Sequence, residues 1–239
     1  MVYEDFTTYV EVEPDNRIQA SAAHIDALLY RNEDAYLYKD FGAGHFTDFE
    51  HLIDVYVAAS TTYGRGYVLV LSEDTLDDFR GLDDNNKTAI GIGFIYFGYT
   101  AGVYPTIGLA EVYQGNYYHD YFADQSLNTW YYFRLKKAGT TLTLRLWTNA
   151  TDRDNNDTGA GSYLGEKGLT LHANHSFRYL LVVDSYNDGE PNQTITFDVE
   201  NLDLQEAPSI VPKKIVLKLG DATGIALNDI SKKERVIII

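Results

Sequence analysis

The chain has 239 residues, a formal net charge of −16, no cysteine, and 20 tyrosines and 11 phenylalanines against two tryptophans. The lack of cysteine excludes disulfides, thiolate metal sites and cysteine nucleophiles. The acidic charge repels phosphate backbones, so we expect no nucleic-acid partner. No apolar run reaches the ~20 residues that a spanning helix needs, so we expect no membrane span.

Short segments that alternate apolar and polar residues follow one another along the chain, separated by turn-forming Pro, Gly, Asn and Asp. This period of two predicts strands with one buried face. Only residues 73–80 look helical, because acids at the start and Arg80 near the end suit the helix dipole. The lack of strand–helix alternation disfavours a parallel α/β fold. About twelve to fourteen short strands fit an all-β, two-sheet antiparallel β-sandwich of the jelly-roll kind. The predicted strands are residues 9–12, 17–20, 25–29, 35–40, 49–57, 66–71, 88–99, 106–113, 117–122, 130–137, 141–147, 178–187 and 194–204.

The C-terminal part of the chain differs in charge from the rest. Residues 1–207 contain 13 Lys and Arg against 32 Asp and Glu, a net charge of −19, whereas residues 208–239 contain six against three, a net charge of +3. Pro208 and Pro212 bracket a linker-like segment, and the chain finishes on an apolar, β-branched run that favours strand addition. We therefore expect a sandwich over residues 1–207 and a short basic C-terminal extension over residues 208–239. This extension packs on its own domain, self-associates into a homo-oligomer, or begins a further module.

Two strand pairs carry a family resemblance. Residues 130–137 read Trp-Tyr-Tyr-Phe-Arg-Leu-Lys-Lys, and a Gly turn then leads to Thr-Leu-Thr-Leu-Arg-Leu-Trp at residues 141–147. These strands, with the closing Asp-Val-Glu-Asn-Leu at residues 198–202, resemble the concanavalin A-like lectin/glucanase superfamily, which includes laminin-G-like jelly-roll modules. The resemblance spans residues 5–205. It implies two curved sheets, a concave face that is often the sugar site, and frequently a structural calcium ion.

The glucanases of that superfamily place three acids on one strand as Glu-x-Asp-x-(x)-Glu, which brings two carboxylates to about 5 Å for retaining hydrolysis. This chain has no such strand. Its nearest match is Glu50 and Asp54, whose even spacing puts both side chains on one face, and a solvated strand face explains that pair better. We therefore favour a protein that is not an enzyme.

A loop rich in Asp and Asn offers a candidate metal site. Asp152, Asp154 and Asn156 alternate, and Asp157 follows directly, so hard oxygen ligands recur as in calcium loops. The segment is not an EF-hand, because its sixth position is Asp rather than Gly. An Asx-rich hairpin loop that binds no metal is the alternative.

Sugar sites combine aromatic faces with Asn, Asp or His for the hydroxyls, and residues 113–121 have that composition. Tyrosines that pack across strands at a sheet edge are the alternative for each residue alone. Trp130 and Trp147 alternate in phase with apolar residues, so we place them in the core or at strand ends. The predicted carbohydrate-binding residues are Tyr99, Tyr104, Tyr113, Asn116, Tyr117, Tyr118, His119 and Asp120.

These observations predict a non-catalytic, lectin-like domain that binds a glycan or polysaccharide, with Ca²⁺ as a candidate cofactor. We expect it on an extracellular, cell-surface or virion-associated protein. A second hypothesis is a structural component of a virus particle or surface layer that self-associates through residues 208–239. A third is a glycoside hydrolase or lyase with an unrecognised site.

Overall fold

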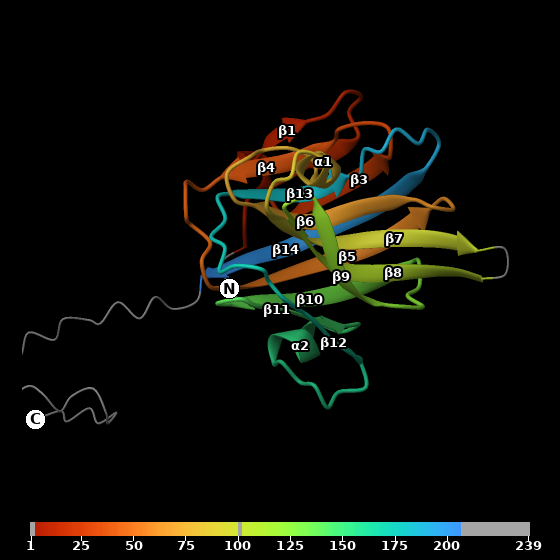
Figure 1. The fold of residues 1–239 in the computed structure, drawn as a ribbon. Coiled ribbons are helices and arrows are strands. Elements are labelled where there is room, and N and C mark those ends of the chain that lie inside the picture. Colours follow the sequence, from red (N-terminus) through yellow and green to blue (C-terminus); the bar gives the residue numbers. More distant parts are fainter. Residues whose placement is uncertain (1–2, 100–101, 207–239) are drawn as a thin grey trace, which may run out of the picture. The chain divides into compact units, whose positions relative to one another are not determined.

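A computed structural model describes residues 3–99 and 102–206, which form two antiparallel seven-stranded sheets packed face to face (Figure 1). In the first sheet the strand order is β1 (Val10–Val12), β4 (Tyr36–Asp40), β13 (Tyr179–Ser185), β6 (Arg65–Ser72), β7 (Ala89–Tyr99), β8 (Gly102–Tyr113) and β9 (Asn116–Phe122). In the second sheet it is β12 (Tyr163–Thr170), β11 (Thr141–Trp147), β10 (Thr129–Ala138), β5 (Phe49–Ser60), β14 (Thr194–Glu206), β3 (His24–Tyr30) and β2 (Ile18–Ala20). The described residues also form three short helices: η1 (Phe6–Thr8), α1 (Phe79–Asp84) and α2 (Ala150–Asp154).

The all-β, two-sheet prediction is confirmed, and one large apolar cluster fills the space between the sheets. In β10 the side chains of Tyr131, Phe133 and Leu135 belong to this core, and the alternation turns Trp130 and Tyr132 to the outer face. Full burial of one such side chain contributes about 1.5–3 kcal/mol. The predicted alternation therefore places one face of a strand such as β10 in the core between the two sheets.

A smaller apolar cluster covers the outer face of the first sheet, where α1 packs against β7 and β8. Phe79 and Leu82 of α1 are fully buried, and the Phe79 ring stacks on Tyr67 with ring centroids 4.2 Å apart. The Tyr67 ring lies over Gly93, where an added Cβ atom would come within 2.6 Å of Tyr67 Cε1. Protein side chains therefore fill the middle of this outer face.

The predicted helix over residues 73–80 is wrong in position, because α1 spans Phe79–Asp84. The Asp78 side chain accepts a hydrogen bond from the Gly81 N–H at 2.7 Å, which makes Asp78 the N-cap rather than a helical residue. The acids before it lie outside the helix. Acidic residues are common both just before and just inside the first turn of a helix. Their presence therefore did not fix the residue at which α1 begins.

Strand β12 was absent from the sequence prediction. Its residues alternate between half-buried and exposed, and none is fully buried. An edge strand of this kind shows no apolar period, which is the main sequence signal for a strand. Its pairing with β11 therefore could not be seen from the sequence.

Helix α2 covers part of the outer face of the second sheet, beside β10 and β11 (Figure 1). The Arg153 guanidinium forms a 2.5 Å ion pair with Asp54 of β5, and both side chains are buried. Burial raises the pKa of the Asp54 carboxyl, and the positive charge of Arg153 opposes that shift. Among the described residues, no helix has the length and apolar character of a membrane-spanning segment.

Candidate functional site

The structure divides the predicted carbohydrate-binding residues between the two faces of β9. Gln114 and Gly115 form the tight turn from β8 into β9, and both have positive φ angles. Beyond the turn, Tyr117 and His119 lie on the outer face of the first sheet. Tyr118 lies on the opposite face of the strand. One sequence cluster thus becomes two separate groups.

The outer group is a row of rings along the edge strand. The Tyr117 and His119 ring centroids are 5.2 Å apart, and those of His119 and Tyr121 are 5.8 Å apart. The Tyr117 hydroxyl lies 3.3 Å from that of Tyr67, which ties this end of the row to the apolar cluster under α1. His119 and Tyr121 remain exposed.

The inner group meets a segment that is distant in sequence. Tyr113 and Tyr118 contact His172, which lies between β12 and β13. The ring of His172 stacks on Tyr113 with an interplanar angle of 14° and a centroid distance of 5.1 Å, and its centroid is 4.1 Å from that of Tyr118. Three rings therefore form one compact surface at the end of the sandwich.

A buried carboxylate fixes this arrangement. Glu111 of β8 is fully buried; its Oε1 accepts the backbone N–H of His172 at 3.1 Å, and its Oε2 lies 2.9 Å from His172 Nδ1. With Nδ1 as the donor, Nε2 is left to accept a hydrogen bond from outside. The His172 side chain is 36% exposed, so a ligand can reach it.

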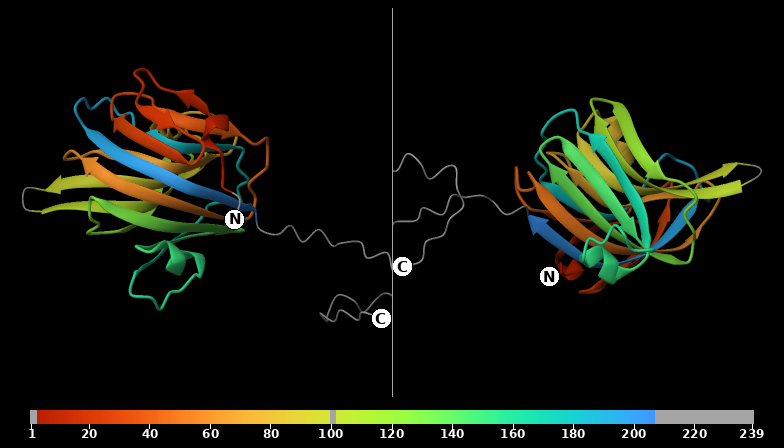
Figure 2. Two further views of the ribbon diagram at one scale, coloured as in Figure 1. Left: turned by 180° about the vertical axis from the view of Figure 1, so that it is seen from behind. Right: turned by 90° about the horizontal axis from the view of Figure 1, so that it is seen from below.

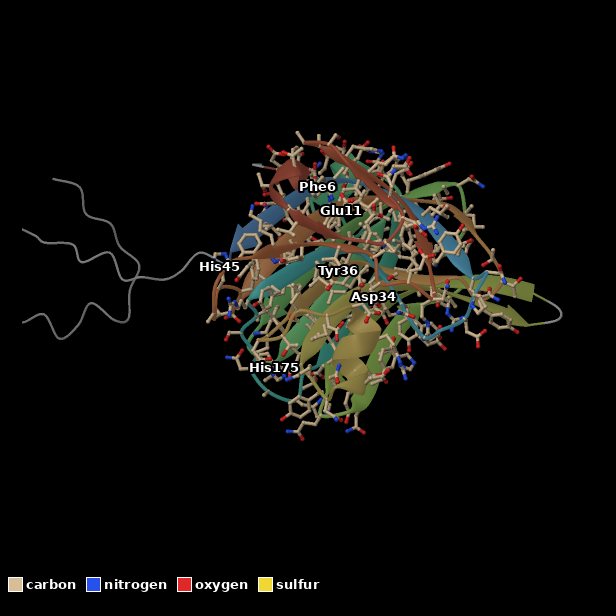
Figure 3. The ribbon with its side chains drawn as sticks, turned by 90° about the horizontal axis from the view of Figure 1, so that it is seen from above. Phe6, Glu11, Asp34, Tyr36, His45 and His175 are labelled. Atoms are coloured by element: carbon tan, nitrogen blue, oxygen red, sulfur yellow. The ribbon has the colours of Figure 1, made fainter. Side chains whose placement is uncertain are left out.

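His175 completes the group. It is almost fully buried, and its Nε2 lies 3.4 Å from Glu111 Oε1. In Figure 3, the His175 label lies on the teal segment that leads from β12 to β13. We call Glu111, Tyr113, Tyr118, His172 and His175 the rim cluster.

The other predicted sugar-binding residues have different surroundings. Asp120 accepts the Gly168 N–H at 3.2 Å and lies 3.3 Å from Lys167 Nζ, so it links β9 to β12. The Asn116 amide donates to the backbone of its own turn. Tyr99 and Tyr104 belong to β7 and β8, but their side chains lie outside the described residues.

Each side chain of the predicted calcium loop has a protein partner. Asp152 accepts the Ser162 hydroxyl at 2.5 Å, and Asp154 accepts Arg153 Nε at 2.8 Å. Asn156 accepts a hydrogen bond from Arg145 at 2.9 Å, and Asp157 accepts the Gly159 N–H at 2.9 Å. Within the described residues, no group of three or more His, Asp or Glu is placed to hold a metal ion. In this conformation these oxygens accept hydrogen bonds from the protein, so a calcium ion would have to displace the protein donors.

A further group of acids lies beside α1. Asp184 is fully buried; its Oδ2 accepts the Phe79 N–H at 2.9 Å, and its Oδ1 has no hydrogen-bond partner. Burial raises the pKa of Asp184 well above its ordinary value and raises that of Asp78 to about 7. The negative charge of Asp34 adds to both shifts and to that of Tyr36, and Figure 3 shows Asp34 and Tyr36 beside α1. Two hydrogen bonds to the first turn of α1 give these acids a structural role.

Comparisons with known proteins agree on the fold. No protein-family model matches the chain, and no curated protein matches it in sequence. An alginate lyase from Pseudomonas aeruginosa aligns with a TM-score of 0.53 at 8% identity, covering 81% of this chain and 87% of the lyase. The exoplasmic/lumenal domain of VIP36, bound to Ca²⁺ and a mannose disaccharide, aligns with a TM-score of 0.52 at 13% identity, covering 84% and 83%. A functionally unknown protein from Saccharomyces cerevisiae aligns with a TM-score of 0.53 at 7% identity, covering 85% and 98%. The chain therefore has the fold of the concanavalin A-like lectin/glucanase superfamily.

Proposed function

We propose that this chain is a glycan-binding domain and that the rim cluster is its binding site. The observation that carries the proposal is the buried Glu111, which holds the His172 ring against Tyr113 and Tyr118. Lectin and alginate lyase structures share the fold, which supports a glycan as the ligand.

The chemistry of the rim cluster suits a sugar. The parts of Tyr113 and Tyr118 that the His172 ring leaves uncovered offer apolar area for the C–H face of a pyranose ring, and the two hydroxyls can donate hydrogen bonds. His172 Nε2 offers a further acceptor whose direction the buried carboxylate sets. Because the protein already orders these groups, little conformational entropy is lost when a ligand binds.

Calorimetric titration with oligosaccharides, chosen from a glycan array, tests the site. We expect Tyr118→Ala and His172→Ala each to weaken binding by about tenfold or more, since each removes a ring contact or a fixed hydrogen bond. His119→Ala is the matched control, because His119 lies on the opposite face of the same strand. Binding lost in His119→Ala and kept in His172→Ala would move the site to the outer face.

The cellular setting follows from the same ligand. A domain that binds glycans belongs in a secreted, surface or lumenal context, as for the lumenal domain of VIP36. Self-association through residues 208–239, which lie outside the described residues, stays a prediction. Size-exclusion chromatography with and without these residues tests it, and an unchanged oligomer would remove their role.

A second candidate function is polysaccharide cleavage. An imidazole that donates Nδ1–H to a buried carboxylate and presents Nε2 to solvent is arranged like a general base, and Tyr118 lies beside it. Lyase activity would appear as ultraviolet absorbance of an unsaturated product, and hydrolysis as new reducing ends. We expect either activity to disappear in His172→Ala. Tyr113→Phe, which keeps the aromatic ring, should still bind the substrate.

Calcium is proposed separately for the loop over residues 152–157. The calcium-bound forms of the VIP36 domain support it in general terms. Binding would require Asp152 to release Ser162, which costs a hydrogen bond. A rise in melting temperature on adding calcium that is absent from Asp152→Asn would support this site, and equal curves with calcium and chelator would remove it.

A further inference from the structure

Three aromatic rings form a continuous surface on the outer face of the second sheet, away from the rim cluster. Tyr56 of β5 is directly opposite Trp130 of β10, with ring centroids 5.5 Å apart. Trp130 and Tyr132 stack along β10 at 6.4 Å with an interplanar angle of 23°. All three side chains are only partly buried. We call Tyr56, Trp130 and Tyr132 the sheet platform.

Carboxylates continue the same row across the sheet. The strand register places Asp198 of β14 opposite Tyr56, and Asp26 of β3 opposite Asp198. Directly opposite residues share a face, so Asp26, Asp198, Tyr56 and Trp130 form one line. Three strand spacings of ~4.8 Å make this line roughly 14 Å long. The left view of Figure 2 shows β14, β5 and β10 as neighbouring blue, orange and green strands.

The two carboxylates of this line have negative surroundings. Neither Asp26 nor Asp198 forms an ion pair with a described residue, and the nearby His24 pairs with Glu200 at 3.1 Å. Desolvation and the charges of Asp26 and Glu200 raise the pKa of Asp198, and the charge of His24 opposes that shift. A positive charge placed between these two acids would relieve their repulsion, whereas a uronate would add to it.

The ring surface and the acids together define one ligand chemistry. A cation next to aromatic faces gains from the negative face of each ring as well as from a carboxylate. A glucosamine unit joins both features, because it has an apolar pyranose face and a protonated amine. Neutral sugars use only the rings of this surface, and alginate-like polymers meet the repulsive carboxylates.

We propose that the outer face of the second sheet is a separate binding site for amino-sugar glycans, with pyranose faces stacked on Trp130 and Tyr56 and the ammonium group between Asp198 and Asp26. This site goes beyond the proposed function of the rim cluster, and neither site depends on the other.

Calorimetric titration of the full chain with glucosamine hexamer tests the proposal, with the N-acetylglucosamine hexamer as the uncharged comparison. We expect the glucosamine hexamer to bind about tenfold or more tightly than its N-acetylated form. Trp130→Ala should weaken both by about tenfold. The double variant Asp26→Asn and Asp198→Asn should bring the two hexamers to equal affinity, because it removes the acids and keeps the rings.

The matched control carries the same change of net charge elsewhere. Asp124→Asn with Glu190→Gln removes two exposed acids outside the platform and should preserve the preference for glucosamine. His172→Ala should also preserve this preference. A failure of the rim-cluster proposal is therefore distinguishable from a failure of the platform proposal. Loss of the preference in the control, or equal binding of a hexalysine peptide, would overturn the proposal, because either marks a general affinity of this acidic chain for cations. Far-ultraviolet circular dichroism and a cooperative thermal transition verify that each variant keeps its fold.

Discussion

The rim cluster and the sheet platform present aromatic rings in two physically different ways. In the rim cluster, a fully buried carboxylate orders a histidine that comes from 61 residues further along the chain. In the sheet platform, strand register brings Trp130 next to Tyr56, and the buried Arg153 lies over the Tyr132 ring at the other end of the row. A locked cluster suits one ligand geometry, whereas an open row suits repeated contacts along a polymer. If both proposals hold, the same fold provides one site with a fixed geometry and one that contacts a polymer along its length.

The largest expected effect is a loss of folding stability on the platform side of the molecule. Arg153→Leu leaves the Asp54 carboxylate buried without its cation, beside Tyr132 of the platform. We expect a loss of about 3–5 kcal/mol in the free energy of unfolding, measured by chemical denaturation. Arg145→Leu is the control, since its ion pair with Glu166 is exposed and contributes about 1 kcal/mol or less. Equal losses in the two variants would contradict the buried pair.

The next effect lies away from both surfaces and depends on pH. The pKa of Asp78 is about 7 in the folded protein against an ordinary 3.8, so the folded state binds more protons between these values. The stability that Asp78 contributes is therefore full below about pH 4 and is lost as the pH rises through about 7. This loss belongs to the α1 region and should change binding at neither surface.

Asp184→Asn tests the origin of that pH dependence. The asparagine oxygen can still accept the Phe79 N–H, while a buried carboxyl group with a raised pKa disappears. We expect higher stability at pH 8 and a flatter stability profile between pH 4 and 7. A profile as steep as that of the parent chain would assign the pH dependence to other groups.

A smaller effect tests whether Glu111 orders the His172 ring in the rim cluster. Glu111→Gln keeps an acceptor for the His172 N–H but turns an amide donor toward His172 Nδ1. We expect binding at the rim cluster to weaken about tenfold, because the ring loses its charge-assisted partner. Affinity at the sheet platform should stay within about twofold. A matching loss at both surfaces would mean that Glu111 supports the fold as a whole.

Local alternation predicted most of the scaffold, and long-range contacts account for what it missed. The strand over residues 130–137 was predictable because Tyr131, Phe133 and Leu135 alternate with polar positions. Strand β12 was not predictable, because none of its residues is fully buried.

The candidate site shows the same limit. The aromatic composition of residues 113–121 marked the β8–β9 hairpin, but composition does not say which face of β9 each ring takes. Glu111 and His172 were missed because their contact spans 61 residues. The platform was missed because Trp130 was grouped with the apolar core residues, whereas its side chain lies on the outer face of β10. Register, which the sequence only implies, decided each case.

The most direct test of the account is one calorimetric comparison of the parent chain with His172→Ala and Trp130→Ala, using the same oligosaccharides for all three. The account predicts that the parent chain binds glycans, that His172→Ala loses ligands of the rim cluster alone, and that Trp130→Ala loses glucosamine oligomers alone. Absence of binding by the parent chain, or retention of every ligand by His172→Ala, would contradict the claim that the rim cluster is a glycan site.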